Sequence, residues 1–188
     1  MSYVLFISQK KLTDSTAIGG NVDIEFILPY LKVAQKKHIE RVLGTDLFEA
    51  LQTKISGGTL SGVYETLVDE YVQDALVHWA FFECIPFLRF KVMNNNIVQK
   101  TAENSTPLSR QEANDLREEV RNTAEFYTER LIDYLRHNNS SYPELNTNTN
   151  EDISPSKNAF YSGMNLEKVR DRKGGITLSD FLTPDLNE

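Results

Sequence analysis

The stretch YETLVDEYVQDALVHWA, residues 64–80, decides the fold. Its apolar residues recur at steps of three and four, the spacing of one face of an α-helix, and they are Tyr64, Leu67, Val68, Tyr71, Val72, Ala75, Leu76, Trp79 and Ala80. The charged residues between them are all acidic, and no Lys or Arg occurs from Gly62 to Pro86. The pattern predicts a helix from about Ser61 that buries a wide apolar face and carries an anionic back.

Two segments before this stretch also have helical patterns. The first has a candidate cap at Asp23 and ends at Gly44, and Pro29 lies in its opening turns. A shorter helix is expected over residues 46–55, before a Ser-Gly-Gly stop.

A fourth helix follows the long one. Ser109 and Glu112 form a capping box directly after a proline, which is the clearest helix start in the chain. Apolar residues at steps of three and four then continue to about His137. The sequence therefore predicts an all-α fold, an antiparallel bundle of about four helices with a kink near Pro86.

The rest of the chain divides around this core. We expect an extended N-terminal arm over residues 1–22, a helical core over 23–138 with a projecting loop or hairpin at 94–107, and an extended C-terminal tail over 139–188. The tail is rich in Asn, Ser and Thr, so it buries too little area to offset the entropy of ordering. We expect it to dock on other chains through scattered anchors, namely Phe160, Tyr161, Ile176, Leu178, Phe181 and Leu182.

Composition narrows the function. A net charge of −7 and a pI near 5.1 oppose nucleic-acid wrapping, which needs clustered Lys and Arg. The single cysteine, Cys84, allows no internal disulfide and is expected to be a buried thiol. Neither the apolar run Tyr3–Ile7 nor the stretch 81–90 reads as a signal peptide or a membrane span. The chain thus reads as a soluble protein of a reducing compartment.

No motif indicates catalysis or a bound metal. The three histidines, His38, His78 and His137, lie far apart and lack the spacing of a metal site. His38 interrupts an apolar seam and is expected to have a hydrogen-bonded packing or interface role, with no charged partner identifiable for a pH switch. The Gly-rich run 56–62 joins two helices and lacks the ending of a phosphate loop. We expect no enzyme, cofactor or metal.

Two oppositely charged helix faces point to self-association. The helix ending at Gly44 carries a basic back, Lys32, Lys36, Lys37 and Arg41, whereas the long helix carries an acidic one, Glu65, Asp69, Glu70 and Asp74. We expect part of one face to meet the other across a subunit boundary, since a closed head-to-tail ring joins two different patches. Solvation of both faces is the alternative. Ile97 and Val98, in the projecting loop, are further candidate contacts.

The order of elements resembles the head–tail connector proteins of tailed bacteriophages, in particular those of crAss-like podophages. The resemblance covers about residues 23–135, and the Asn-rich loop contributes to it. Its motifs are Ile27-Leu-Pro-Tyr30, Ala34-Gln35-x-x-x-Ile39, Leu43-Gly44-x-x-Leu47-Phe48, the aromatic helix through Trp79, and Ala124-x-x-Tyr127-x-x-Arg130-Leu131-x-x-Tyr134-Leu135.

The resemblance implies a non-catalytic virion protein, made in the host bacterial cytoplasm. It implies a twelve-fold ring beneath the portal that joins capsid to tail and forms part of the DNA conduit during genome ejection. The implied partners are further copies of the chain, the portal protein, and tail or second-ring proteins. DNA would pass without specific binding, which suits an acidic subunit, and no membrane is involved. The alternative is a small helical adaptor or regulator that binds one protein partner through its amphipathic helices.

Overall fold

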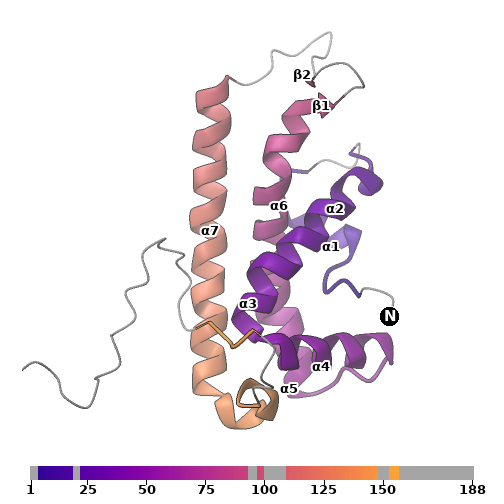
Figure 1. Cartoon of the computed structure of the whole chain (residues 1–188), viewed down its shortest axis with the longest axis vertical. Coiled ribbons are helices and arrows are strands. Elements are labelled where there is room, and N and C mark those ends of the chain that lie inside the picture. The colour runs from indigo at the N-terminus through magenta and orange to yellow at the C-terminus, as the bar shows by residue number, and fades with distance from the viewer. Residues whose placement is uncertain (1–3, 19–21, 93–96, 100–108, 148–152, 157–188) are drawn as a thin grey trace, which may run out of the picture.

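A computed structural model describes residues 4–18, 22–92, 97–99, 109–147 and 153–156. The predicted all-α fold is confirmed (Figure 1). Each predicted helix is present. The helix that ends at Gly44 and the long helix with the acidic back each contain a π-helical turn. In chain order the main elements are α1 (Gln9–Ser15), α2 (Ile24–Ala34), η1 (Gln35–Ile39), α3 (Glu40–Leu43), α4 (Thr45–Ser56), α5 (Val63–Leu67), η2 (Val68–Val72), α6 (Gln73–Arg89) and α7 (Arg110–His137).

The long helix predicted from about Ser61, with its acidic back, lies at the centre of the fold. It comprises α5, η2 and α6 in succession, and every residue of its predicted apolar stripe is buried or half-buried. It continues through Pro86 to Arg89. The middle turn is π-helical, and such a turn holds an extra residue that a regular 3.6-residue pattern does not anticipate.

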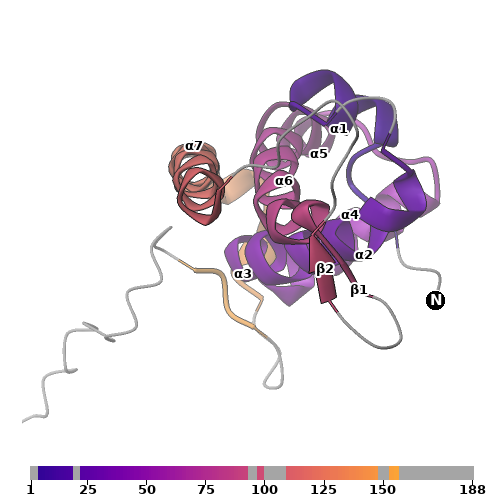
Figure 2. The same ribbon diagram turned by 90° about the horizontal axis from the view of Figure 1, so that it is seen from above.

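Helix α7 packs antiparallel along one side of the central helix. Trp79 of α6 contacts Thr128, and Tyr71 of η2, eight residues before Trp79, stacks on Tyr134, six residues after Thr128, at 3.9 Å between ring centroids. The predicted capping box is present at Ser109 and Glu112, and α7 ends at His137 as the pattern predicts. Figure 2 shows α7 set to one side of α6, with α1, α2 and α4 on the other.

The rod formed by α2, η1 and α3 packs on the opposite side of α6. Tyr30 stacks on Phe87 and His38 stacks on Trp79, so this rod also runs antiparallel to α6. Gly44, with a φ of 75°, ends the rod and turns the chain into α4, which lies across one end of the bundle (Figure 1).

The expected N-terminal arm is corrected by the structure. Phe6, Ile7, Leu12 and Ile18 are all buried, and helix α1 forms within this segment. The buried side-chain amide of Gln35 holds the start of this segment against the core. It accepts from the Phe6 N–H at 2.9 Å and donates to the Val4 carbonyl at 2.8 Å. Residues 4–18 are therefore part of the core.

The predicted projecting hairpin is partly described. Strand β1 (Phe90–Val92) continues from the upper end of α6 and pairs antiparallel with β2 (Ile97–Gln99) (Figure 1). Lys91 is opposite Val98 in this register. The remainder of the expected 94–107 loop lies outside the described residues.

The expected boundary between core and tail is also corrected. After α7, two short 3-10 turns, η3 (Asn139–Ser141) and η4 (Pro143–Leu145), place Tyr142 in the core with no exposed surface. Its hydroxyl donates to the Val63 carbonyl at 2.8 Å. One buried aromatic ring thus outweighs the polar composition around it, and the core extends past residue 138.

Candidate functional site

A polar cluster links the α2–α3 rod to the central helix. Glu83 Oε1 accepts from Lys37 Nζ at 2.7 Å and from His38 Nε2 at 2.8 Å. The His38 ring stacks on Trp79 with centroids 3.7 Å apart and planes 6° apart. The Trp79 indole then donates to the Thr128 hydroxyl at 2.8 Å, which extends the cluster to α7. Three helices are therefore connected through one run of side chains.

The charges of this cluster follow from burial. The hydrogen bond from His38, reinforced by Lys37, holds the pKa of Glu83 at about 2, against the opposing effect of burial. Burial lowers the pKa of His38, and this outweighs the attraction of Glu83. At neutral pH the ion pair is therefore Lys37–Glu83, and His38 joins it as a neutral donor. The arrangement is a cross-link between helices, which agrees with the expected packing role of His38.

Sequence reasoning missed the partner of His38. Glu83 lies 45 residues away, in the aromatic end of α6, and no local spacing relates the two. A second histidine, His78 of α6, stacks on Tyr127 of α7 with ring centroids 5.0 Å apart. Cys84 is buried as predicted, and burial raises the pKa of its thiol to about 12, so the thiolate required of a nucleophile does not form near neutral pH.

The basic residues predicted to form one interface face are spread along the α2–α3 rod. Lys36 pairs with the buried Glu40, and Lys37 pairs with Glu83. Their side chains remain 62% and 57% exposed. Lys32 is exposed, whereas Arg41 is half-buried and its carbonyl accepts from the Ser156 N–H at 2.8 Å. The structure thus leaves Lys36 and Lys37 accessible but partly neutralised within their own subunit.

The acidic face is more open. Glu65, Asp69 and Glu70 are exposed on α5 and η2, and Asp69 accepts a hydrogen bond from Gln73. Asp74 is half-buried and pairs with Lys11 of α1 at 3.5 Å. The structure therefore does not unite the eight predicted charges in one site, and Glu65 and Glu70 are the members most available to a second molecule.

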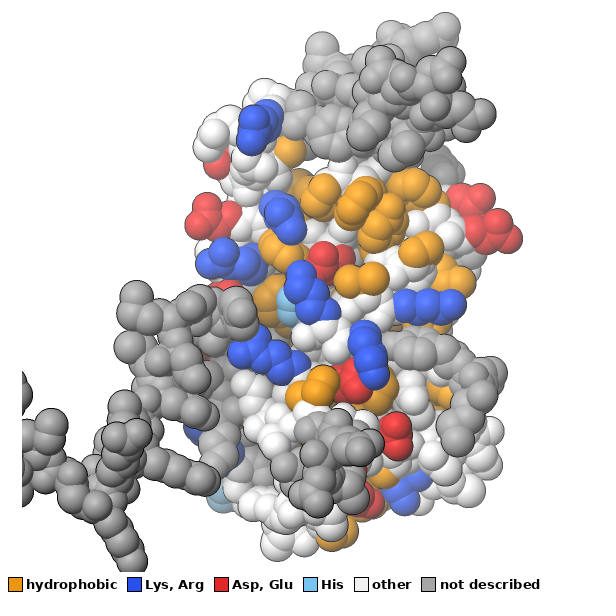
Figure 3. Space-filling view, viewed as in Figure 1, with side chains coloured by type: hydrophobic (Ala, Val, Ile, Leu, Met, Phe, Trp, Pro, Cys, Tyr) orange, Lys and Arg blue, Asp and Glu red, His pale blue; other side chains and the backbone are white. Residues whose placement is uncertain are grey.

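The sequence did not single out an apolar surface between α2 and α6. Phe87 and Val33 are 44% and 47% exposed, and Tyr30 stacks on Phe87 with centroids 4.4 Å apart. Pro29, one turn before Val33, is exposed beside them. We call these four residues the apolar ridge. Figure 3 shows hydrophobic side chains gathered on the upper part of this face, with Lys and Arg side chains below and around them.

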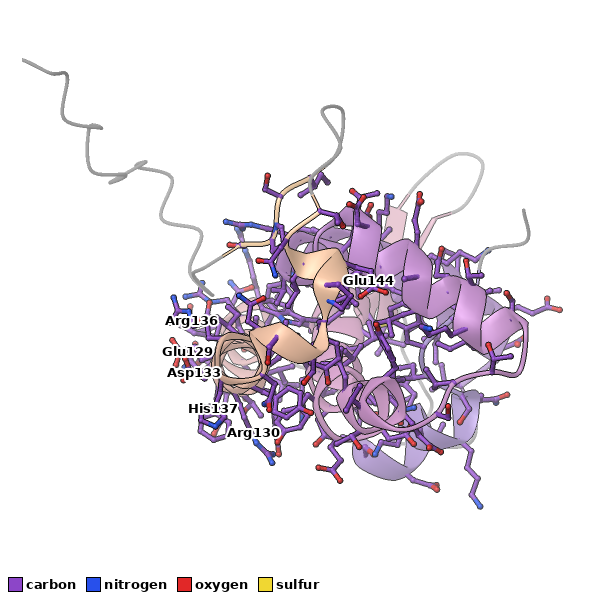
Figure 4. The ribbon with its side chains drawn as sticks, turned by 90° about the horizontal axis from the view of Figure 1, so that it is seen from below. Glu129, Arg130, Asp133, Arg136, His137 and Glu144 are labelled. Atoms are coloured by element: carbon purple, nitrogen blue, oxygen red, sulfur yellow. The ribbon has the colours of Figure 1, made fainter. Side chains whose placement is uncertain are left out.

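The lower end of α7 carries a separate group of charges. Figure 4 shows Glu129, Asp133 and Arg136 on the side turned away from the other helices. Arg136 lies 3.5 Å from Asp133, and Glu144 accepts from the Tyr64 hydroxyl at 2.9 Å instead of joining them. Within the described residues, no three His, Cys, Asp or Glu side chains are grouped as a metal site requires. This surface is a solvated helix back.

The tail returns to its own domain at one described point. Ile153 accepts from the Thr45 N–H at 3.1 Å and donates to the Thr45 hydroxyl at 3.1 Å. Pro155 sits so close to Gly44 that a Cβ there would meet its ring at 2.8 Å. The predicted docking anchors from Phe160 to Leu182 lie outside the described residues, as do the side chains of Ile97 and Val98.

Comparisons with known proteins identify a family but no close relative. None of the helices in the described part of the chain has the length and apolar content that crossing a bilayer requires. Neither the curated proteins nor the solved structures contain a match. A family model described as "Family of unknown function (DUF6712)" matches residues 39–154, which run from the buried end of η1 to the docked return of the tail. Because this match covers more than half of the chain, the protein belongs to the DUF6712 family.

Proposed function

We propose that this protein is a structural subunit of a bacteriophage virion that forms a ring beneath the portal, joining capsid to tail and forming part of the DNA conduit. The observation that carries the proposal is the separation of two exposed, oppositely charged surfaces on different helices of one packed subunit. Lys36 and Lys37 lie on the α2–α3 rod, and Glu65 and Glu70 on α5 and η2. Heterologous contacts between two different patches generate rings when their rotation closes.

The internal packing supports a scaffold. Aromatic stacks and the Trp79–Thr128 hydrogen bond connect α6 with α7, and the His38–Glu83 contact connects α6 with the α2–α3 rod. Such cross-links hold the outer surfaces in fixed relative positions, which a repeating ring contact requires. The net charge of −7 also suits a conduit that DNA crosses without adhering. The ring stoichiometry of twelve, the portal partner and the virion location rest on the resemblance to the head–tail connector proteins of tailed bacteriophages.

Size-exclusion chromatography with light scattering, followed by negative-stain microscopy, tests the ring. We expect closed rings of the purified protein, alone or with portal protein. The double reversal Glu65→Lys/Glu70→Lys should weaken assembly, and raised salt should have the same effect because it screens exposed charges. Reversal of the exposed pair Glu118 and Glu119 on α7 is the matched control, expected to leave assembly unchanged.

The apolar ridge supports a second candidate function, a small helical adaptor that binds one protein partner. The oligomeric state of the purified protein distinguishes the two functions. An adaptor stays monomeric at every concentration and in the presence of portal protein, and that result would replace the ring proposal.

A further inference from the structure

The apolar ridge is an exposed surface that the packing of the subunit itself does not use. Its four members come from two helices, and the Tyr30–Phe87 stack joins α2 to α6 within it. Val33 and Phe87 each leave nearly half of their side-chain surface accessible. Lys36 and Lys37 follow Val33 by three and four residues, on the next turn of the same rod, and their side chains are 62% and 57% exposed although each pairs with a Glu of its own subunit. An occupant with apolar side chains and carboxylates therefore complements this surface.

The end of this same chain has that composition. Residues 176–188, ITLSDFLTPDLNE, contain three acidic residues and no Lys or Arg. Their apolar residues are Ile176, Leu178, Phe181, Leu182 and Leu186. The preceding residues 167–173, EKVRDRK, are mixed in charge, which sets the last segment apart from the stretch directly before it. Its charge and hydropathy complement the ridge and its bordering lysines.

The path of the chain brings this segment within reach. Ser156, the last described residue, donates its N–H to the Arg41 carbonyl on the same rod that carries the ridge. Residues 157–175 separate it from Ile176, and a chain of that length spans up to about 66 Å when extended. The longest helix, α7 with 28 residues, measures about 42 Å. The tail is therefore long enough to reach the rod of a neighbouring copy.

We infer that residues 176–188 of one copy dock on the apolar ridge of a second copy, with Phe181 and its apolar neighbours on Tyr30, Val33 and Phe87 and the carboxylates facing Lys36 and Lys37. The inference rests on the proposed ring, because a ring supplies the neighbouring ridge. It names the surface on which the predicted C-terminal tail docks. A tethered contact of this kind adds avidity through effective concentration even when the isolated segment binds weakly.

Binding of the segment is measured first, on a full-length chain whose own segment is disabled. The variant Ile176→Ser/Leu178→Ser/Phe181→Ser/Leu182→Ser leaves the ridge available, and a fluorescently labelled peptide of residues 174–188 is the probe. We expect saturable binding by fluorescence anisotropy. Adding Val33→Glu/Phe87→Glu should weaken it at least tenfold, whereas Val63→Glu should not, because Val63 is equally exposed, at 45%, on a different helix. Absence of binding, or equal loss with Val63→Glu, overturns the inference.

Photo-crosslinking then identifies which copy supplies the segment. A benzophenone amino acid replaces Phe181 in the otherwise unchanged full-length chain. We expect irradiation to yield covalent dimers whose crosslinks map to α2 and α6. Crosslinks confined to single chains, or mapped to other helices, overturn docking between copies. An oligomeric protein that binds no peptide refutes this inference and leaves the ring proposal intact, whereas peptide binding and crosslinked pairs without ring formation refute the ring alone.

Discussion

Trp79 donates its indole N–H to the Thr128 hydroxyl at 2.8 Å, and Thr128 in turn donates to the Ala124 carbonyl at 2.7 Å. Both side chains are buried at the boundary between the central helix and α7. The indole N–H is the single hydrogen-bond donor of a Trp side chain, and here its acceptor lies on the neighbouring helix α7. The bond therefore fixes how far α7 can slide along α6.

Removing the hydroxyl should be costly. We expect Thr128→Val to lower the free energy of unfolding by about 1–3 kcal/mol, because it leaves the Trp79 N–H buried without a partner. Thr128→Ser keeps the acceptor and should cost less. Urea unfolding followed by circular dichroism measures both. Thr123→Val, on a less buried position of the same helix, is the control, and an equal loss there would argue against the hydrogen bond as the cause.

The success of the sequence reasoning was uneven for physical reasons. The α7 start, the apolar stripe of the central helix and the Gly44 stop follow from contacts within a few residues, so local spacing predicts them. The His38–Glu83 contact joins residues 45 positions apart and leaves no periodic trace. The π-helical turns η1 and η2 are likewise not predictable from a regular 3.6-residue pattern.

Composition misled the prediction at both ends of the core. The segment around Tyr142 is polar on average, yet a single ring buried against Tyr64 and Tyr134 fixes it. Near the N-terminus, a side-chain amide satisfies backbone groups that a neighbouring strand would otherwise serve. Average hydropathy registers neither effect, because each depends on one residue meeting a distant partner. The apolar ridge escaped notice for the opposite reason, since its residues look like ordinary positions of two amphipathic helices, α2 and α6.

The Lys37–His38–Glu83 cluster should make stability fall in acid. The pKa of His38 is lowered in the folded state, so its contribution is complete above its ordinary pKa of 6.5 and is lost as the pH falls below it. The pKa of Glu83 is lowered from 4.5 to about 2, so its contribution of up to about 3 kcal/mol is lost as the pH falls through that range. Urea unfolding at a series of pH values measures both losses.

Two variants separate these contributions. Glu83→Gln should abolish the loss between pH 4.5 and 2 while lowering stability at pH 7, since Lys37 then lacks its carboxylate. His38→Gln keeps a side-chain donor and should remove the loss just below pH 6.5. If Glu83→Gln retains the full low-pH loss, other carboxylates are responsible.

Gln35 should control the N-terminal segment. We expect Gln35→Leu to cost about 1–3 kcal/mol, because the Phe6 N–H loses its partner and the Val4 carbonyl keeps only the longer contact from Gln52. Hydrogen exchange should increase over residues 4–18 much more than over α7. Gln52→Leu is the comparison, since its contact with the Val4 carbonyl, at 3.4 Å, is the longer of the two. Uniformly faster exchange throughout the chain would mean that Gln35 supports the whole core instead.

Gly44 should govern the docking of residues 153–156. Gly44→Ala puts a Cβ where φ is 75° and within 2.8 Å of the Pro155 ring, so we expect a loss of at least about 1 kcal/mol and release of the segment. Limited proteolysis should then cut the variant after residue 153 faster than the wild type. Gly58→Ala has the same backbone strain but meets nothing within 4 Å, which separates strain from the lost contact.

The return of the tail to the Gly44 corner has a mechanical consequence. Tension applied beyond Ser156 enters the fold through its bond to the Arg41 carbonyl and the two Ile153–Thr45 hydrogen bonds, before it reaches Tyr142 or α7. The load therefore passes to the junction of α3 and α4, at the base of the bundle. A pulled tail therefore transmits force to the end of the α2–α3 rod without first unpacking Tyr142 or α7.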